Sequence, residues 1–320
     1  MGPLPRILVV IILPLVGFGA VASEYPSVPV EMAPVQVSNH AWYVPGGTGV
    51  ATDNYGFVSN SAFVVSSAGV IVFDTLGTPA LGAKLLAAIR EVTDAPIRRI
   101  YISHYHADHM YGSQAFDGIG AEIITSDGAK RYLEGEVAQR RLAERRVSLE
   151  PWVNDDTRIV YPDRYLKGEE RFEFGDLSIR VVDVGSAHSE GDLVLFVEDD
   201  GVLFSGDIIF EGRIPFLGTS SSAAWLDVLD EMEQADVGVI VPGHGRAAEN
   251  PREIVSLTRN YLAFVRASMR QAVDNWIPFD EAYEATDWGD FIEYPAFTEA
   301  NRRNAYGIYL SLEQESLKSQ

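Results

Sequence analysis

Four side chains that can bind a metal ion lie within six residues, His104-Tyr105-His106-Ala107-Asp108-His109, directly after an apolar run at 100–102. The chain has no cysteine, so its nitrogen and oxygen ligands must come from His, Asp or Glu, which bind zinc at about 2.0–2.2 Å. His104 and His106 point the same way if the segment is strand-like, whereas Asp108 and His109 diverge at the start of a helix. The segment can therefore supply ligands to two neighbouring ions. The alternative is a solvated loop that is rich in histidine.

Three more candidate ligands each follow an apolar run that we predict to be a strand, namely His188, Asp207 and His244. In layered folds, catalytic groups tend to lie on loops at one end of the strands. Each residue alone is weak evidence, because a histidine after a strand can be structural and an aspartate after Ser-Gly is typical of a turn. Together they indicate one coordination set.

Two polar residues near strands are interpreted differently. His40 is the one histidine outside this pattern, and we interpret it as a structural or surface residue. Asp74 also follows a predicted strand, and we expect it to orient a ligand histidine rather than to bind metal.

The elements that must position these side chains alternate between strands and helices. Strands are predicted at 40–44, 56–66, 70–73, 98–102, 121–125, 171–174, 177–184, 193–197, 202–205 and 237–241. Helices are predicted at 78–91, 110–116, 126–149, 222–234, 251–270, 280–285 and 298–314. The polar segment 151–171 has little periodicity and is either an insertion over the site or a surface linker. This order predicts an α/β layered sandwich with two β-rich halves.

Charge and the N-terminal segment limit the possible partners and location. Asp and Glu outnumber Lys and Arg by 46 to 25, and the formal net charge is −21, which argues against nucleic-acid binding because that needs a basic face. Residues 7–20 form an apolar run followed by Ala20-Val21-Ala22, which is typical of a signal-peptidase site. We expect a cleaved signal peptide at 1–22 and a periplasmic or secreted chain without a stable membrane span; a retained anchor is the alternative.

The motif and its partners resemble the metallo-β-lactamase superfamily over roughly residues 35–246. The shared features are the H-x-H-x-D-H motif at 104–109, the strand-end Asp74, and the single ligands His188, Asp207 and His244. The resemblance implies a four-layer αββα sandwich, with a catalytic domain at 23–250 and extra C-terminal helices at 251–320. Asp207 stands where many lactamases have cysteine, which is similar to the glyoxalase II-like branch.

The same resemblance implies how the ligands divide between two ions. One zinc would be held by His104, His106 and His188, and the other by Asp108, His109 and His244, with Asp207 between them. Zinc suits these ligands best, and iron or manganese is also compatible with nitrogen and oxygen donors. Segments 188–193 and 206–218 and the helical tail further resemble exported SoxH-like and quinoprotein-relay zinc metallohydrolases.

The implied activity is hydrolysis of a small-molecule ester, thioester, lactone or amide carbonyl by a metal-activated water, which Asp108 would orient while it also binds the second ion. The alternatives are β-lactam hydrolysis and a metal-binding accessory role in a periplasmic oxidation system. Candidates for substrate contact are Tyr111, Arg213 and the loop 46–55, each of which can equally be a packing or surface feature. The sequence does not determine the substrate, the metal or the oligomeric state.

Overall fold

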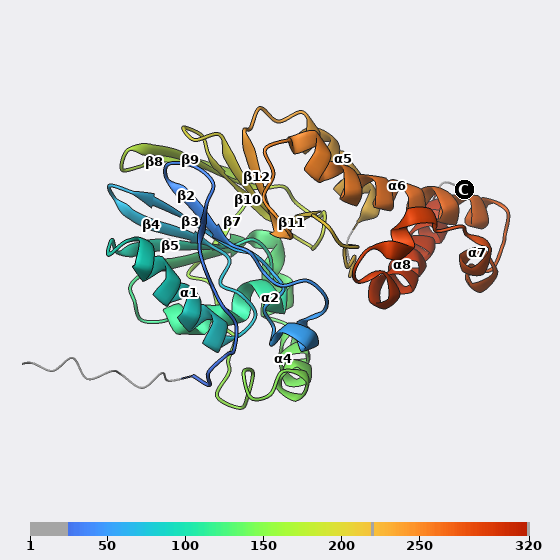
Figure 1. Cartoon of the computed structure of the whole chain (residues 1–320). Helices are drawn as coiled ribbons and strands as arrows, with labels where there is room; N and C mark the ends of the chain where they lie inside the picture. The colour runs from blue at the N-terminus through green and yellow to red at the C-terminus, as the bar shows by residue number, and fades with distance from the viewer. Residues whose placement is uncertain (1–24, 219–220, 319–320) are drawn as a thin grey trace, which may run out of the picture.

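Two β-sheets lie face to face between layers of helices in the computed structural model, which describes residues 25–218 and 221–318 (Figure 1). The first sheet has the order β1(Val35–Gln36), β2(Ala41–Val44), β3(Ser61–Ser66), β4(Gly69–Phe73), β5(Ile97–Ile102), β6(Glu122–Ser126) and β7(Arg164–Leu166). The second has the order β12(Val239–His244), β11(Val202–Phe210), β10(Leu193–Val197), β9(Leu177–Asp183) and β8(Glu169–Phe174). The predicted αββα sandwich is therefore correct.

Helices cover the outer face of each sheet. The first sheet is covered by α1(Pro79–Val92), α2(Ala107–Met110), α3(Lys130–Leu133) and α4(Glu136–Ser148), with the 3-10 turns η1(Ala51–Asn54), η2(Tyr111–Phe116) and η3(Asp127–Ala129). The second is followed by α5(Ser222–Glu233), α6(Pro251–Asp274), α7(Phe279–Ala285), η4(Gly289–Glu293) and α8(Phe297–Lys318). Figure 1 shows α7 and α8 extending beyond the edge of the sandwich.

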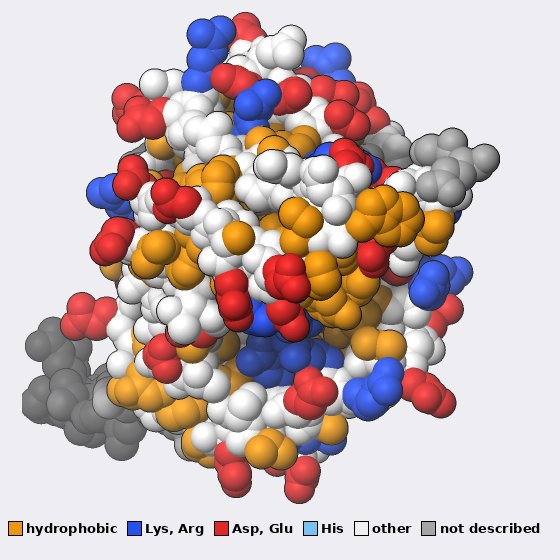
Figure 2. Space-filling view, turned by 90° about the vertical axis from the view of Figure 1, so that its right-hand side faces the viewer, with side chains coloured by type: hydrophobic (Ala, Val, Ile, Leu, Met, Phe, Trp, Pro, Cys, Tyr) orange, Lys and Arg blue, Asp and Glu red, His pale blue; other side chains and the backbone are white. Residues whose placement is uncertain are grey.

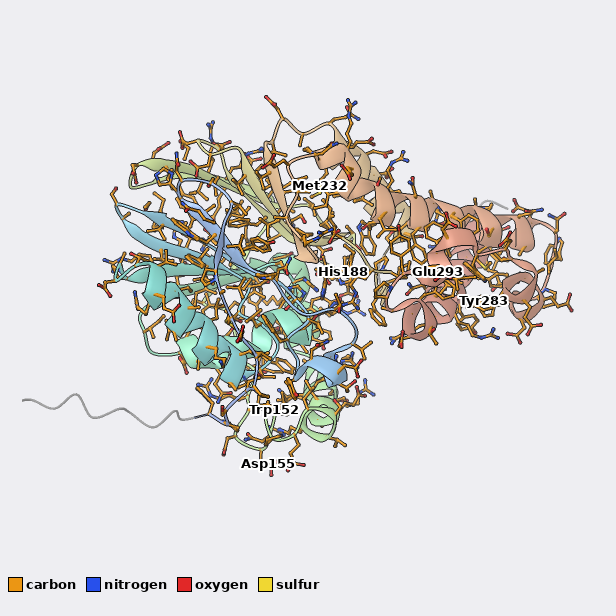
Figure 3. The ribbon with its side chains drawn as sticks, in the orientation of Figure 1. Trp152, Asp155, His188, Met232, Tyr283 and Glu293 are labelled. Carbon is orange, nitrogen blue, oxygen red and sulfur yellow. The ribbon has the colours of Figure 1, made fainter. Side chains whose placement is uncertain are left out.

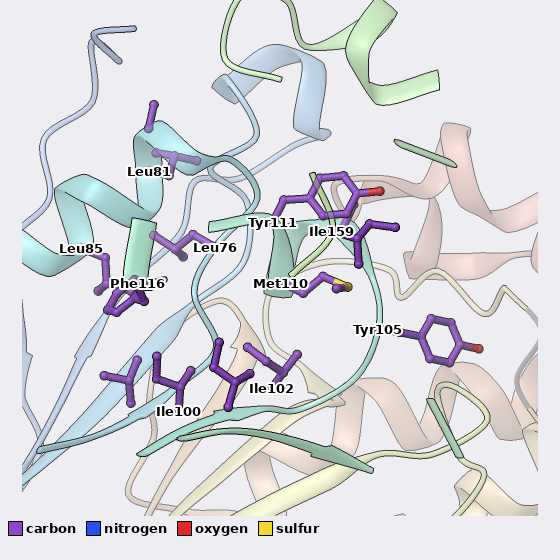
Figure 4. Packing of buried hydrophobic residues seen from close by; sticks show 14 of the residues in the cluster. Leu76, Leu81, Leu85, Ile100, Ile102, Tyr105, Met110, Tyr111, Phe116 and Ile159 are labelled. Atoms are coloured by element: carbon purple, nitrogen blue, oxygen red, sulfur yellow. The ribbon is translucent and has the colours of Figure 1, made fainter. Parts of the chain in front are cut away.

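The alternation of side chains along β4 shows why four layers form. Successive residues of a strand point to opposite faces, and in β4 Val70 and Val72 pack toward α1 whereas Ile71 and Phe73 pack toward the second sheet. Because both faces are covered, every residue of β4 is buried, as expected for an inner strand of a layered sheet. In Figure 4, Leu85 of α1 lies beside Phe116 above Ile100.

A close approach of two glycines fixes the element that carries the H-x-H-x-D-H motif. A Cβ atom on Gly82 of α1 would lie 2.2 Å from the carbonyl oxygen of Gly112 in η2. Because only glycine leaves room for this contact, the backbones of α1 and η2 pack directly against each other. The helical turns that follow the motif are thereby fixed against the first sheet. At the start of α1, Thr78 Oγ1 accepts a hydrogen bond from the Leu81 amide at 3.1 Å, which is a standard N-cap.

The single helix predicted at 126–149 is wrong. Ser126 ends β6, and the chain then forms η3 and α3 before α4 begins at Glu136. Gly135 adopts an extended conformation and precedes α4, and glycine in a helix interior costs about 1 kcal/mol relative to alanine. Gly128 is also held by tertiary packing, because a Cβ there would lie 2.1 Å from the Glu190 carbonyl oxygen.

The segment 151–171 also differs from the prediction of an irregular connection. It contains β7, which pairs in parallel with β6 through Ile124 and Arg164, and the start of β8. Two of its apolar residues, Val153 and Ile159, are buried in the core beneath the first sheet. Their spacing has no regular period because most of the segment is not in a regular element.

The C-terminal helices share one apolar core with the second sheet. Phe210 of β11, Trp225 of α5, Tyr261 of α6 and Ile308 of α8 belong to the same buried cluster. No helix in the described part of the chain is both long and apolar enough to span a bilayer. The predicted signal peptide at 1–22 lies outside the described residues.

Candidate metal centre

All seven predicted ligands meet at one end of the two sheets. His104, His106, Asp108 and His109 follow β5, and His188 follows β9. His188 lies where the sheets meet the C-terminal helices (Figure 3). The prediction that Asp207 and His244 lie in loops after strands is wrong, because Asp207 lies within β11 and His244 is the last residue of β12.

An irregularity in β11 explains how a strand residue reaches the site. The parallel pairing of β11 with β12 shifts register between Phe204 and Gly206 and again between Gly206 and Phe210. Gly206 has a φ of +52°, a conformation that glycine adopts without a Cβ penalty. Such irregularities re-aim a side chain, and here the carboxylate of Asp207 is directed toward the histidines.

The first ligand group contains His104, His106, His188 and Asp207. His188 Nε2 lies 2.9 Å from His106 Nδ1 and 3.3 Å from Asp207 Oδ2. His104 Nε2 lies 3.8 Å from the same Asp207 oxygen. All three histidines therefore present one ring nitrogen to a common point.

The second group contains Asp108, His109 and His244. Asp108 Oδ2 lies 3.6 Å from His109 Nε2 and 3.5 Å from His244 Nε2. The other oxygen of Asp207, Oδ1, lies 3.1 Å from His109 Nε2 and 3.3 Å from His244 Nε2. Asp207 thus faces one group with each carboxylate oxygen and joins the two.

These separations fit two metal ions. Two ligands bound about 2.0–2.1 Å from one tetrahedral ion lie roughly 3.3–3.4 Å from each other, and the distances above lie on both sides of that value. His104 Nε2 is buried without a hydrogen-bond partner among the described residues. Buried polar atoms are normally satisfied, and a bound cation would satisfy this nitrogen.

Asp74 orients two of the histidines, as predicted for a residue outside the ligand set. Its Oδ2 lies 2.7 Å from His109 Nδ1 and accepts a hydrogen bond from Ser103 Oγ at 2.8 Å. Ser103 Oγ in turn lies 2.9 Å from His104 Nδ1. Asp74 has a φ of +65°, an uncommon conformation in which Asp is several-fold enriched. The contacts direct the Nε2 atom of each ring toward the metal position.

The remaining histidines are held by other partners. His244 Nδ1 donates to the Val58 carbonyl oxygen at 2.7 Å, and its ring stacks on Phe210 with centroids 4.9 Å apart. The His188 ring meets the edge of Trp225, with centroids 5.1 Å apart. His40 lies elsewhere and bonds Asp200 through Nδ1 at 2.9 Å, which agrees with the structural role predicted for it.

Burial and charge set the protonation of the cluster. Burial lowers the pKa of His106 to about 4, that of His188 to about 3, and that of His104 well below its ordinary value. Burial alone would raise the pKa of Asp108 and Asp207, but the facing imidazoles outweigh it and lower both. Three neutral imidazoles and two ionised carboxylates are the forms that bind a cation.

His109 is the exception among the histidines. Burial lowers its pKa, but the carboxylates of Asp207, Asp74 and Asp108 outweigh burial and raise the pKa well above the ordinary value. Metal-free His109 is therefore an imidazolium at pH 7, with Nδ1 directed at Asp74 and a proton on Nε2.

Metal binding at pH 7 should consequently release about one proton, because the ion must replace the His109 Nε2 proton. Since that proton leaves more readily as pH rises, metal affinity should increase with pH. Calorimetric titration of the metal-free protein in two buffers of different ionisation enthalpy measures the release. An Asp74→Asn variant, which removes one carboxylate that raises the pKa, should release fewer protons. A heat of binding that is the same in both buffers would contradict this assignment.

A cavity of about 330 Å³ opens onto both ligand groups, within the usual size range of small-molecule sites. Arg213 and residues 50–52 of the predicted contact loop line it, whereas Tyr111 does not. Tyr111 is 3% exposed and packs in the core near Met110 (Figure 4), so its predicted substrate contact is not supported.

Sequence reasoning missed several residues of the cavity wall. Arg141 and Arg145 come from α4, and Glu299, Arg303 and Asn304 come from α8. The spacing of Arg141 and Arg145, four residues apart in a helix, places them on one face, but nothing in the sequence says what that face meets.

Fold and site together define an αββα protein with a His/Asp metal-binding cluster at the edge of its two sheets. The sequence model of the Metallo-beta-lactamase superfamily matches residues 54–244, more than half of the chain. The chain belongs to the metallo-β-lactamase superfamily.

Proteins of similar sequence include an alkylsulfatase and an acyl-coenzyme A thioesterase. A linear primary-alkylsulfatase of Pseudomonas sp. (strain ATCC 19151) is 22% identical over 253 residues, which are 68% of this chain and 47% of that protein. Acyl-coenzyme A thioesterase MBLAC2 of Gallus gallus is 27% identical over 175 residues, 50% of this chain and 61% of that protein. The chain thus spans about half the length of the alkylsulfatase.

Among solved structures, the stereoselective inverting sec-alkylsulfatase Pisa1 from Pseudomonas sp. is similar in fold. The TM-score is 0.68 at 14% sequence identity, over 87% of this chain and 50% of that one. The likeness extends past the superfamily match into the C-terminal helices, because it covers a larger share of the chain.

Proposed function

We propose that this protein is an exported metal-dependent hydrolase that holds two zinc ions and cleaves an ester, thioester, lactone or amide bond. The observation that carries the proposal is the single carboxylate of Asp207, which faces both ligand groups at 3.1–3.8 Å. A carboxylate that faces two groups of histidines suits a pair of dications. Divalent cations held there would lower the pKa of a water molecule toward neutrality and polarise the bond that it attacks.

The proposed role of Asp108 follows from its place at the floor of the cavity. Its side chain is 21% exposed, whereas those of its neighbours His109 and His244 are 0% and 5% exposed. The Asp108 carboxylate borders the cavity and can accept a hydrogen bond from a water there, which orients the water's lone pair toward a substrate. The facing imidazoles lower the pKa of Asp108, so its carboxylate is ionised and can accept that hydrogen bond.

The relatives support hydrolysis of an activated acyl or sulfate ester. One similar protein is named an acyl-coenzyme A thioesterase and another an alkylsulfatase. Sulfate-ester hydrolysis is the second candidate function, favoured by the arginines that line the cavity. β-Lactam hydrolysis is a narrower version of the same chemistry. We further propose that residues 23–250 form the catalytic unit, that 251–320 complete its cavity wall, and that the segment 1–22 directs export to the periplasm or outside the cell.

Metal analysis combined with a substrate screen tests the proposal. The purified protein should contain close to two zinc ions per chain, and should hydrolyse at least one member of a panel of thioesters, lactones, aryl esters, alkyl sulfates and nitrocefin. A chelator should abolish that activity, and added zinc should restore it. Full metal loading without turnover on any substrate would favour the accessory metal-binding role instead. Fractionation and N-terminal sequencing of the mature chain test export.

A further inference from the structure

Arg213 is a buried cation without a counter-ion. Its side chain lines the cavity and the residue is 6% exposed. Its Nε atom has no hydrogen-bond partner among the described residues. Its Nη1 lies 3.5 Å from His244 Nδ1, but that nitrogen already donates its proton to Val58 and cannot accept another. The guanidinium carbon of Arg213 lies 5.6 Å from the centroid of the Phe216 ring, but an aromatic face does not neutralise the charge, and a buried charge without a counter-ion is costly.

A second arginine approaches the same cavity from another element. Arg145 on α4 is partly buried, and its Nε also lacks a partner among the described residues. Arg141 lies one turn earlier on α4 and, within the described part of the chain, forms an ion pair only with the exposed Glu144. The chain has a net charge of −21, yet these three arginines line one cavity. Figure 2 shows a hollow lined with Lys and Arg side chains, beside hydrophobic side chains and with Asp and Glu at its rim.

The loop that carries Arg213 is fixed directly after the arginine. The Ile214 amide donates to the Pro295 carbonyl oxygen at 3.0 Å. The Leu217 amide donates to Asn304 Oδ1 at 3.0 Å, and Asn304 Nδ2 donates to the Pro215 carbonyl oxygen at 2.7 Å. Asn304 is itself buried on α8. The arginine is therefore held in place by packed elements rather than free to turn into solvent, as a binding group should be.

The arginines are not needed to balance the negative charge of the ligand carboxylates. No carboxylate of the described residues lies within ion-pair distance of Arg213 or Arg145, although Asp108, Asp207 and Glu299 border the same cavity. Two dications would already outweigh the two ligand carboxylates. With metals bound, the cavity would carry a large positive charge, which favours an anion from solution.

We propose that Arg213 and Arg145, with Arg141 at the rim, form an anion-binding subsite beside the metal centre, and that the substrate carries a carboxylate, sulfate or phosphate group there. This inference rests on the proposed function and narrows its substrates to anionic molecules. Guanidinium groups match the oxygens of such groups in geometry and charge. Val50, Ala51 and Phe216 supply the apolar wall for the organic part.

Binding without turnover tests the subsite independently of hydrolysis. Zinc-loaded protein is titrated calorimetrically with benzenesulfonate, benzoate and the neutral methyl phenyl sulfone. The two anions should bind and the sulfone should not. Arg213→Gln and Arg145→Gln should each weaken anion binding about 10- to 100-fold, as expected for loss of a charge-assisted hydrogen bond, with metal content measured for each variant. Arg252→Gln, an exposed residue outside the cavity with the same charge change, should bind like the unaltered protein.

A matched pair of aryl esters, one with a terminal sulfonate and one neutral, extends the test to catalysis. Arg213→Gln should lower the ratio of kcat/KM between the charged and neutral esters about 10- to 100-fold, mainly through KM for the charged ester. Equal anion affinity in the unaltered protein and both metal-replete arginine variants would overturn the subsite, as would tight binding of the neutral sulfone. If arginine-dependent binding is found but no ester is hydrolysed, the subsite stands and the proposed function fails.

Discussion

An Asp207→Ala variant should lose both metal ions and on the order of 10³-fold or more of hydrolytic activity, because the ions supply several kcal/mol of transition-state stabilisation. Asp207 presents one carboxylate oxygen to each group: Oδ2 faces His104 and His188, and Oδ1 faces His109 and His244. Removing it takes a negative charge and a ligand from each ion. Elemental analysis and kcat/KM on the best substrate of the panel measure the two losses.

Asp200→Ala is the matched control for that variant. Asp200 also faces a histidine, with His40 Nδ1 at 2.9 Å from its Oδ1, but this pair lies away from the metal centre and is partly exposed. Such pairs contribute about 0–1 kcal/mol, so its metal content and activity should be unchanged. If Asp207→Ala retained two ions, the joint coordination of the groups by this carboxylate would be wrong.

A Gly243→Ala substitution should disable the centre without removing any ligand. A Cβ atom at residue 243 would lie 2.1 Å from Asp207 Oδ1 and 2.6 Å from the backbone carbon of Gly206. Backbone cannot move aside as a flexible side chain can, so β12 or the Asp207 carboxylate must shift. Overpacking of this kind costs about 1–3 kcal/mol, and displacement of Asp207 should lower zinc affinity at least 10-fold by analogy with loss of a ligand-orienting contact.

Gly307→Ala provides the comparison for Gly243→Ala. A Cβ there meets nothing within 4 Å, and alanine is favoured over glycine in a helix such as α8. Thermal unfolding and competitive zinc titration of both variants separate the two effects. An Asp207 site that binds zinc normally in a folded Gly243→Ala protein would contradict the packing argument.

The candidate ligands could be selected from the sequence because each belongs to a short motif beside an apolar strand. The signal is the residue type itself in the compact motif at 104–109 and in Asp207 and His244, which lie next to glycines. Their convergence was also predictable, since the ends of strands in a layered fold share an edge. The bulge that aims Asp207 from within β11 was not, because it depends on pairing with β12.

The cavity wall was less predictable, for a physical reason. The segment 136–148 is rich in charge, and such a helix normally presents a solvated face. Which of its arginines turns inward depends on where α4 lies against the loop 211–218, a contact between segments far apart in the chain. The prediction for Tyr111 failed in the opposite sense, because its ring packs in the core and does not line the cavity.

The hydrogen bonds from Asn304 to the loop around Arg213 have a consequence for how this protein can change over evolution. Every candidate ligand precedes residue 245, whereas Glu299, Arg303 and Asn304 of the cavity wall follow it. Part of the cavity wall is thus encoded in a different stretch of the gene from the candidate ligands. Mutations in the tail can alter which molecules are admitted while the reacting centre is inherited intact.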